Sequence, residues 1–290
     1  MAIYDVNGNS IALAYGLDNT LLGIIYDVNG DIVFSPNTIK VMEYNVGQYH
    51  IGSGSLMPAS EKETYADLQT TIFNNHNPDI CLMQEATTNF CADGTIADDF
   101  LSTWFDTFRT SRGSIPYQGH KVATNGYSIV DYTDVPFINA VGNYPAYETF
   151  YITLNGKSVF FVNTHMSTNQ TYQVAQCMEV LDAVSDKEYF VICGDFNTVI
   201  TSALNEEDYT DCIKPFLDAG YADANCGKFG VFPNYYATSD PNASYKPATD
   251  HIIVSSNIKI VNAYVDTTKL TDDIDDKIDH VPLIAELVVL

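Results

Sequence analysis

The sequence has few basic residues. Its 290 residues include 13 lysines and arginines against 37 aspartates and glutamates, which gives a formal net charge of −24. A negative field of this size repels polyanions, so the composition argues against a non-specific nucleic-acid-binding protein that depends on neutralising phosphates. It does not exclude an enzyme that reaches a phosphate group through bound divalent cations, because a cation reverses the local field.

The sequence also lacks a long hydrophobic run. No stretch of about 18 apolar residues is present, so we expect no membrane-spanning segment. The N-terminal residues have neither the basic region nor the apolar region of a secretory signal. This favours a cytoplasmic or particle-associated protein over a secreted one.

None of the six cysteines forms a C-x-x-C pair or a Cys/His cluster with zinc-site spacing. Cys81 and Cys193 lie in apolar, strand-like runs, and Cys177 lies on the apolar face of a predicted helix, so we expect three buried thiols. Cys212 and Cys226 lie in loop-like sequence and could form a bridge. The pattern fits a reducing compartment better than a disulfide scaffold.

What the sequence has is an ample apolar fraction. Apolar residues make up 46% of the chain, with 20 tyrosines and 15 phenylalanines, which is typical of a globular protein with a sizeable core. No linker rich in Pro, Gly and Ser divides residues 38–290, so we predict one domain there.

Residues 1–37 stand apart from this domain. The sequence Tyr-Asp-Val-Asn-Gly occurs at 4–8 and again at 26–30, and Asn-Gly favours a two-residue hairpin turn. Each copy is therefore predicted to be a strand that enters a tight turn. Two interpretations stay open: a small accessory hairpin region packed on the main domain, or an arm for attachment or oligomerisation.

The pattern of apolar residues in 38–290 indicates strands joined by hairpins, with a few helices between them. Such a mix is explained by two sheets packed face to face with helices outside, an α/β sandwich. Asn155-Gly156 marks one clear hairpin turn. The predicted helices cover residues 60–76, 96–108, 170–184 and 213–217, and the predicted strands cover 38–45, 79–85, 127–132, 147–154, 158–163, 190–193, 250–255, 258–265 and 283–290.

Polar side chains follow or interrupt these apolar runs at one strand end after another. The clearest case is the run from Phe190 to Cys193, which ends abruptly in Gly-Asp-Phe-Asn. Any one such residue is explained by ordinary turn chemistry, but their joint occurrence predicts a site on a rigid scaffold. The set comprises Asn45, Glu85, His165, Asp195, Asn197, Asp250, Asp279 and His280.

Three members of this set suit a divalent cation. Carboxylates such as those of Glu85 and Asp279 are hard oxygen ligands, and Asn45 adds a neutral oxygen. A hydrated Mg²⁺ needs only one or two carboxylates, so we expect Mg²⁺ or Mn²⁺ here. Ca²⁺ is an alternative as a structural ion, although the acidic run at 272–276 fits a solvated loop better than a calcium site.

The remaining members suit hydrolysis of a phosphodiester. Asp195 can take a proton from an attacking water, helped by Asn197. His165 and His280 can donate hydrogen bonds to phosphoryl oxygens where negative charge develops. Asp250 could orient His280 once the chain is folded and keep the imidazole cationic.

Six short motifs together resemble the endonuclease/exonuclease/phosphatase superfamily. This is the fold shared by pancreatic-type deoxyribonucleases, AP endonucleases, neutral sphingomyelinases, inositol-polyphosphate 5-phosphatases and deadenylases. The resemblance covers residues 38–290 and implies a four-layer α/β/β/α sandwich with Mg²⁺-dependent hydrolysis. In chain order the motifs are Met42-Glu43-Tyr44-Asn45, Met83-Gln84-Glu85, Asn163-Thr164-His165, Gly194-Asp195-Phe196-Asn197, Thr249-Asp250-His251-Ile252 and Asp279-His280-Val281-Pro282.

Carried over position by position, the resemblance implies a role for each residue. The metal neighbourhood falls on the same three ligands named above. Asp195 manages the water and Asn197 contacts the phosphate, while His280, supported by Asp250, stabilises the transition state and His165 assists at the phosphate. The Thr-His pair at 164–165 resembles the deoxyribonuclease and sphingomyelinase branches.

The substrate stays open between three hypotheses. The first is a nuclease that cleaves DNA or RNA, the second a phosphatase or a phospholipid or sphingomyelin phosphodiesterase, and the third a non-catalytic, particle-associated binding module. Only Arg109, Arg112, Lys121 and Lys246 are basic residues that we would place near the cleft. His251 also departs from the family, in which an aromatic residue usually follows the aspartate.

Overall fold

The computed structural model describes most of the predicted catalytic domain. The described residues are 38–46, 59–86, 98–110, 119–141, 144–200, 211–225, 248–266 and 280–290, together with four short strands within the first 37 residues. In this part of the chain no helix is long and apolar enough to cross a membrane.

Two six-stranded sheets form the centre of the protein. The first has the order β15-β16-β5-β6-β8-β7 and the second β13-β14-β12-β11-β10-β9. Within each sheet one pair is parallel, β5 with β6 and β11 with β12, and the other pairs are antiparallel. The strands of the first sheet are β5 (Ile39–Asn45), β6 (Ile80–Gln84), β7 (Thr107–Thr110), β8 (Lys121–Thr124), β15 (Ile258–Val265) and β16 (Leu283–Val289). Those of the second are β9 (Val130–Val141), β10 (Tyr144–Leu154), β11 (Lys157–His165), β12 (Phe190–Ile200), β13 (Ala222–Asp223) and β14 (Ala248–Val254).

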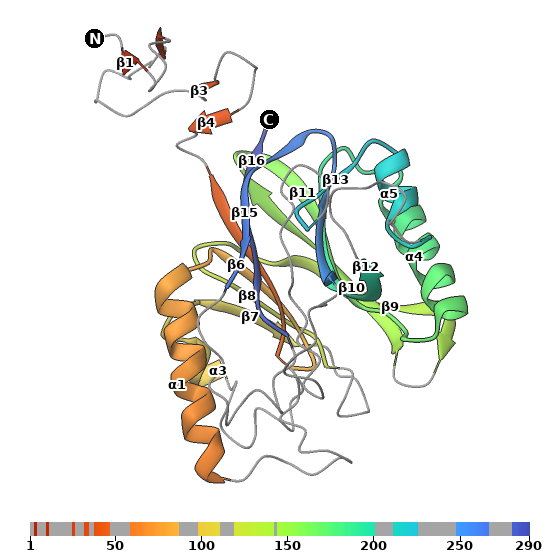
Figure 1. Ribbon diagram of the computed structural model, residues 1–290, viewed down its shortest axis with the longest axis horizontal. Helices are drawn as coiled ribbons and strands as arrows, with labels where there is room; N and C mark the ends of the chain where they lie inside the picture. The colour runs from red at the N-terminus through yellow and green to blue at the C-terminus, as the bar shows by residue number, and fades with distance from the viewer. Residues whose placement is uncertain are drawn as a thin grey trace.

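Helices cover the outer face of each sheet (Figure 1). The helices α1 (Ala59–His76) and α3 (Asp98–Leu101) pack on the first sheet, where Phe73 and Leu101 share an apolar cluster with outward residues of β5 and β6. The helices α4 (Gln170–Val184) and α5 (Lys214–Asp218) pack on the second sheet in the same way. The result is a four-layer α/β/β/α sandwich, as predicted from the sequence.

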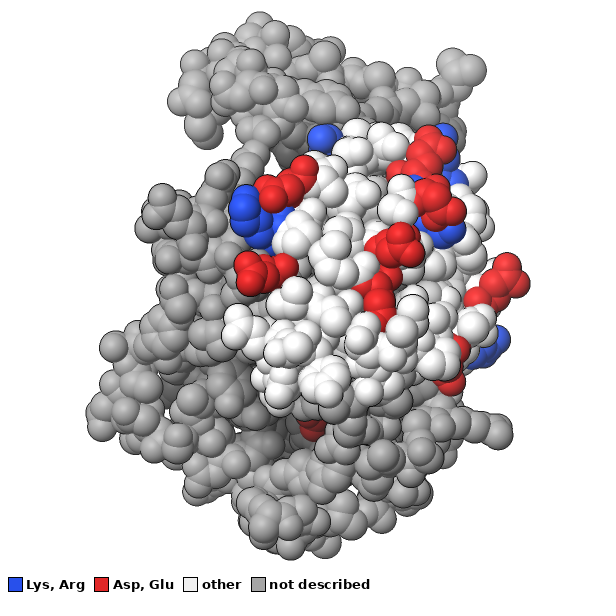
Figure 2. Space-filling view, turned by 90° about the vertical axis from the view of Figure 1, so that its right-hand side faces the viewer, with Lys and Arg blue, Asp and Glu red and all other residues white. Residues whose placement is uncertain are grey.

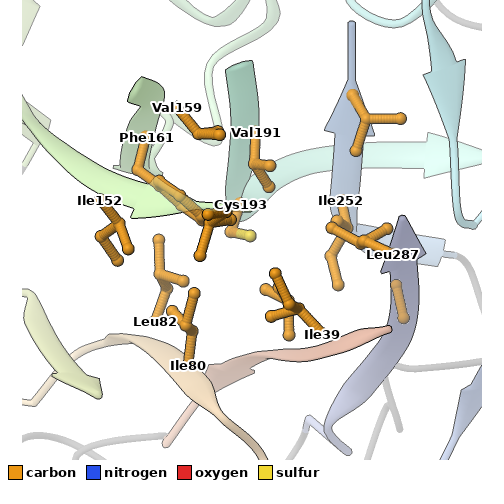
Figure 3. Close-up of a cluster of buried hydrophobic side chains, with 14 of the residues drawn as sticks. Ile39, Ile80, Leu82, Ile152, Val159, Phe161, Val191, Cys193, Ile252 and Leu287 are labelled. Atoms are coloured by element: carbon orange, nitrogen blue, oxygen red, sulfur yellow. The ribbon is translucent and has the colours of Figure 1, made fainter. Parts of the chain in front are cut away.

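The two sheets enclose the main apolar core (Figure 3). Alternate residues of each strand point inward because side chains on a strand change face at every step. Leu82 from the first sheet and Phe161 and Val191 from the second are fully buried there. On β12 the inward positions are Val191 and Cys193, and the next inward position is Asp195. The core thus leads directly to the predicted catalytic residues.

The predicted elements agree with the structure in most places. The helix expected at 170–184 is α4, and the hairpin turn at Asn155-Gly156 joins β10 to β11 with φ values of 51° and 76°. The helix expected at 96–108 is wrong. Only α3 is helical, Phe105 is buried against Phe73, and Thr107–Thr110 forms the edge strand β7. The β-branched threonines at both ends of this strand favour an extended chain.

The cysteines lie as predicted with one exception. Cys81, Cys177 and Cys193 are buried and free. Cys212 is also free and fully buried, so the suggested bridge to Cys226 is wrong. Its sulfur donates instead to Gln173 Oε1 at 3.4 Å.

The two Tyr-Asp-Val-Asn-Gly segments lie between paired strands. The strand β1 (Ile3–Tyr4) pairs antiparallel with β2 (Ser10–Ile11), and β3 (Ile25–Tyr26) pairs with β4 (Ile32–Phe34). This agrees with the strands expected on either side of each turn. The turn residues lie outside the described residues, and the separate role of residues 1–37 stays a prediction.

Candidate active site

The predicted residues meet at one edge of the sandwich, where the parallel strands of both sheets end. Asn45 is the last residue of β5, and Asp195 follows the apolar part of β12. The amide Nδ2 of Asn45 donates to Asp195 Oδ2 at 3.0 Å, which links the two sheets directly. Both side chains are almost completely buried. The strand ends therefore form one site and not two.

Glu85 joins this site from the end of β6. The Asn45 amide also lies 3.5 Å from Glu85 Oε1. The backbone of Glu85 has φ of 57°, a left-handed conformation that is uncommon for a residue with a side chain. Conformations of this kind cost free energy and concentrate at functional sites, where the surrounding structure holds them.

The segment Gly194-Asp195-Phe196-Asn197 owes its shape to its first and last residues. A Cβ atom at Gly194 would lie 2.1 Å from the carbonyl oxygen of Thr164 on the neighbouring parallel strand, so only glycine fits. Asn197 has φ of 51°, and its backbone N–H turns back to donate to Asp195 Oδ1 at 2.7 Å. Its side-chain amide donates to the carbonyl of Met166 at 2.7 Å. Both carboxylate oxygens of Asp195 are thus held by donors.

Two histidines converge on Asp195 Oδ2. His165 Nε2 lies 3.4 Å away and His280 Nε2 lies 3.6 Å away. The other ring nitrogen of His280 is 2.7 Å from Asp250 Oδ2. Because a carboxylate only accepts hydrogen bonds, Nδ1 of His280 carries a proton and donates a hydrogen bond to Asp250. This fixes the ring with Nε2 directed towards Asp195, and it confirms the expected Asp250–His280 contact.

Burial shifts the protonation of these groups. Burial first, and then the carboxylate of Asp250, raise the pKa of Asp195 to about 7. Burial, followed by the charges of His120 and His280, holds the pKa of His165 well below its usual value. Near neutral pH, Asp195 can therefore gain or lose a proton, while His165 is a neutral hydrogen-bonding group.

The donor set at this edge suits a divalent cation. The ligand atoms of Asp195, Asp250 and His280 all lie within 4.8 Å of one another. Glu85 and Asn45 add a further carboxylate and an amide beside Asp195. The carboxylate and amide oxygens of this set are the ligands that Mg²⁺ or Mn²⁺ prefers, and the charge of a cation would offset the crowding of buried carboxylates.

The structure brings together seven of the eight predicted residues. They are Asn45, Glu85, His165, Asp195, Asn197, Asp250 and His280. Asp279, the third predicted metal ligand, lies outside the described residues. So do Arg112 and Lys246, whereas Arg109 is exposed on the edge strand β7 and Lys121 is buried at the start of β8.

Sequence reasoning gave no role to Glu43 or to His120. Glu43 is fully buried two residues before Asn45, and burial, followed by the charges of Asp250 and Asp195, raises its pKa well above the usual value. Its inward position in an alternating strand was the signal that could have identified it. Nδ1 of His120 lies 3.4 Å from Glu148 Oε1, and this pairing depends on how two separate sheets pack.

The face of the protein that carries α4 shows no basic stripe among its described residues (Figure 2). Lysines and arginines are interspersed there with aspartates and glutamates. A backbone-binding surface for nucleic acid needs clustered positive charge. The described residues of this face therefore offer no such surface.

No family model and no curated protein sequence matches the chain. Solved structures do. An endonuclease/exonuclease/phosphatase from Bacteroides vulgatus is 14% identical with a TM-score of 0.68, and the match covers 87% of this chain and 99% of that one. A family protein from Bacteroides thetaiotaomicron is 18% identical with a TM-score of 0.65, over 89% and 100% of the two chains. D. rerio TDP2 in complex with a single-strand DNA product is 12% identical with a TM-score of 0.65, over 87% and 99%. The chain has the fold of the endonuclease/exonuclease/phosphatase superfamily.

Proposed function

We propose that this protein is a divalent-metal-dependent phosphodiester hydrolase, and that it acts as a nuclease on DNA or RNA. One observation carries the proposal. A single buried carboxylate, Asp195, is approached at one oxygen by the Asn45 amide from the opposite sheet and by the imidazoles of His165 and His280. Ordinary turn chemistry gives no reason for three groups from separate parts of the chain to meet at one atom.

The residues divide the work of hydrolysis between them. Asp195, with a pKa of about 7, takes a proton from the attacking water, whose oxygen forms the new bond to phosphorus. The ester P–O bond on the opposite side breaks, and the leaving oxygen takes up a proton from solvent water. His280, held by Asp250, and His165 donate hydrogen bonds to the phosphoryl oxygens, where negative charge develops. Mg²⁺ or Mn²⁺ held by Asn45, Glu85 and Asp279 would polarise the phosphoryl group.

One observation supports a nucleic acid as the substrate. D. rerio TDP2, which shares the fold, is seen with a single-strand DNA product. The net charge of −24 does not favour a polyanion, and the low number of basic residues instead motivates a phosphatase or a lipid phosphodiesterase as the alternative. A phosphatase or a lipid phosphodiesterase would use the same catalytic groups, so the substrate test includes both.

The test is hydrolysis by the full chain of plasmid, single-stranded DNA and RNA in Mg²⁺ or Mn²⁺, with EDTA as the metal-free control. A parallel panel contains phosphoinositides, sphingomyelin and a small phosphomonoester. We expect cleavage of nucleic acid that EDTA and His280→Ala both abolish. Cleavage only in the parallel panel would replace the nuclease by the phosphatase or lipid alternative. Equal cleavage by wild type and His280→Ala would overturn the proposed chemistry.

A matched control is available in His76 at the end of α1. Its Nε2 lies 2.7 Å from Asp266 Oδ2, so it forms an Asp–His pair like that of His280. His76 comes four residues before β6 begins at Ile80, whereas Glu85 follows the other end of that strand, so this pair lies away from the site. His76→Ala should leave hydrolysis within about twofold of wild type.

A further inference from the structure

His251 is a buried histidine that the proposed reaction does not use. It follows Asp250 on β14. Because side chains alternate along a strand, it points away from Asp195 and towards the helices on the second sheet. No part of the residue is exposed. It lies opposite Gly194 in the register of β12 and β14, and its ring contacts that of Phe196 with centroids 5.3 Å apart.

Both ring nitrogens of His251 have partners. Nδ1 is 2.6 Å from Asp223 Oδ2, and Nε2 is 3.0 Å from Thr198 Oγ1. The carboxylate of Asp223 can only accept, so Nδ1 carries a proton and donates it. Asp223 and Thr198 are almost completely buried as well. The three side chains form a continuous hydrogen-bonded chain inside the protein.

These hydrogen bonds support the segment Gly194-Asp195-Phe196-Asn197 from the side of the sheet that faces the helices. Thr198 directly follows Asn197, the residue whose left-handed backbone donates to the Asp195 carboxylate. From the α4 side, Gln173 Nε2 donates to the carbonyl oxygens of Phe196 and Asn197 at 2.9 and 2.5 Å. The segment is thus held by fixed side chains where its backbone leaves regular strand geometry.

The same carboxylate also reaches the second catalytic strand. Asp223 Oδ1 accepts from the backbone N–H of Asn225 at 2.9 Å. The side-chain amide of Asn225 then donates to the carbonyl oxygen of Asp250 at 2.7 Å. Asp223 therefore connects to the Thr198 hydroxyl through His251, and to the backbone of Asp250 through Asn225.

We propose that Asp223, His251 and Thr198 are positioning residues that hold Asp195 and Asn197 in place for hydrolysis. The Thr198 hydroxyl, bonded to His251, fixes the chain directly after Asn197, so that the Asn197 N–H stays on the Asp195 carboxylate. This inference rests on the proposed function for its catalytic consequence. Its structural content, a fixed Asn197–Asp195 contact, is independent of any substrate.

The test compares Thr198→Val with Thr198→Ser. Valine keeps the branched shape of threonine but removes the hydroxyl, whereas serine keeps the hydroxyl and loses the methyl group. With the substrate that wild type cleaves, Thr198→Val should lower kcat about tenfold with KM changed less than about threefold, and Thr198→Ser should stay within about threefold of wild type in both. If the methyl group of Thr198 mattered and its hydroxyl did not, Thr198→Ser would lose more activity than Thr198→Val, and the positioning role would be wrong.

A second readout needs no activity. Hydrogen–deuterium exchange of the peptide covering 194–200 reports whether the Asn197 N–H is held on Asp195. Thr198→Val should speed its exchange about tenfold, while the peptide covering the distant helix α1 exchanges as in wild type. Exchange at 194–200 that is equal in wild type and Thr198→Val would overturn the positioning role, as would equal kcat losses in both variants. Wild type that cleaves no phosphoester, with the exchange difference present, would overturn the proposed function and leave the positioning intact.

Discussion

The protein contains two Asp–His pairs that meet at neighbouring residues of one strand. Asp250 points towards Asp195 and binds His280 at 2.7 Å, while His251, the next residue, points to the other face of the sheet and binds Asp223 at 2.6 Å. The first pair reaches the carboxylate of Asp195 at 3.6 Å, and the second reaches a hydroxyl, that of Thr198, at 3.0 Å.

The difference shows that the pair itself does not decide its role. Both pairs fix the imidazole through Nδ1, as an adjoining carboxylate does in general. What differs is the group that Nε2 faces. Nε2 of His280 faces the ionisable carboxylate of Asp195, whereas Nε2 of His251 faces the hydroxyl of Thr198 and the whole residue is buried. The first arrangement suits a residue that acts in the proposed reaction, and the second suits a residue that holds the catalytic segment in place.

The same substitution at the two histidines should separate these roles. Glutamine offers one donor and one acceptor, as a neutral imidazole does, but it cannot become cationic. His280→Gln should lower kcat about 10³-fold, because it removes the imidazole beside the reacting phosphoryl group. His251→Gln can keep both of its hydrogen bonds and should lower kcat less than about tenfold.

Steady-state hydrolysis of a single-stranded oligonucleotide in Mg²⁺ measures both variants. Unfolding in urea, followed by circular dichroism, shows whether each is folded. A larger loss of kcat in folded His251→Gln than in His280→Gln would reverse the roles given to the two pairs.

Gly194 supports both pairs, and replacing it should weaken the whole region. It precedes Asp195 and lies opposite His251, and a Cβ there would approach the Thr164 carbonyl oxygen to 2.1 Å. Gly194→Ala should lower the free energy of unfolding by about 3 kcal/mol, because two backbone strands would have to separate. Urea unfolding measures this.

Gly126 provides the matched control. An added Cβ there meets no atom within 4 Å, although φ is 77°. Gly126→Ala should cost about 1 kcal/mol from the left-handed backbone alone. Equal costs at the two positions would contradict the close approach of β11 to β12.

Metal binding should depend on the residues around Asp195 and not on the Asp223–His251 pair. Mg²⁺ that binds the folded protein raises its melting temperature in proportion to the logarithm of the metal concentration once the site is nearly saturated. Glu85→Gln removes a carboxylate ligand and should weaken Mg²⁺ binding about tenfold. Thr198→Val should bind Mg²⁺ as wild type does. Calorimetric titration gives both constants, and an unchanged Mg²⁺ affinity in Glu85→Gln would remove that residue from the metal site.

Residues with a local signal could be predicted from the sequence. Asn45, Glu85 and Asp195 each follow an apolar run, and that run predicts a strand that ends at or near the polar residue. Parallel strands of one sheet end at the same edge, and the face-to-face packing of the two sheets brings the ends together. For the same reason the four layers and the helix at 170–184 were predictable.

Features that depend on pairing across the fold could not be predicted in this way. The contact between Asp223 and His251 joins residues 28 positions apart through the register of β13 and β14. The contact between His120 and Glu148 depends on two sheets that pack with a particular offset. The edge strand β7 is only four residues long, so its apolar neighbours suggested a helix instead.

The central claim is that Asp195 is the group on which both sheets converge for catalysis. Asp195→Asn tests it directly, because asparagine has nearly the same shape and its one oxygen can keep the contact with the Asn197 N–H, but its amide group replaces the oxygen that faces Asn45 and cannot take a proton from water. The measurement is kcat of folded wild type and variant on the substrate that wild type cleaves in Mg²⁺ or Mn²⁺. We predict a loss of about 10³-fold or more. A folded Asp195→Asn variant that cleaves within tenfold of wild type would contradict the account.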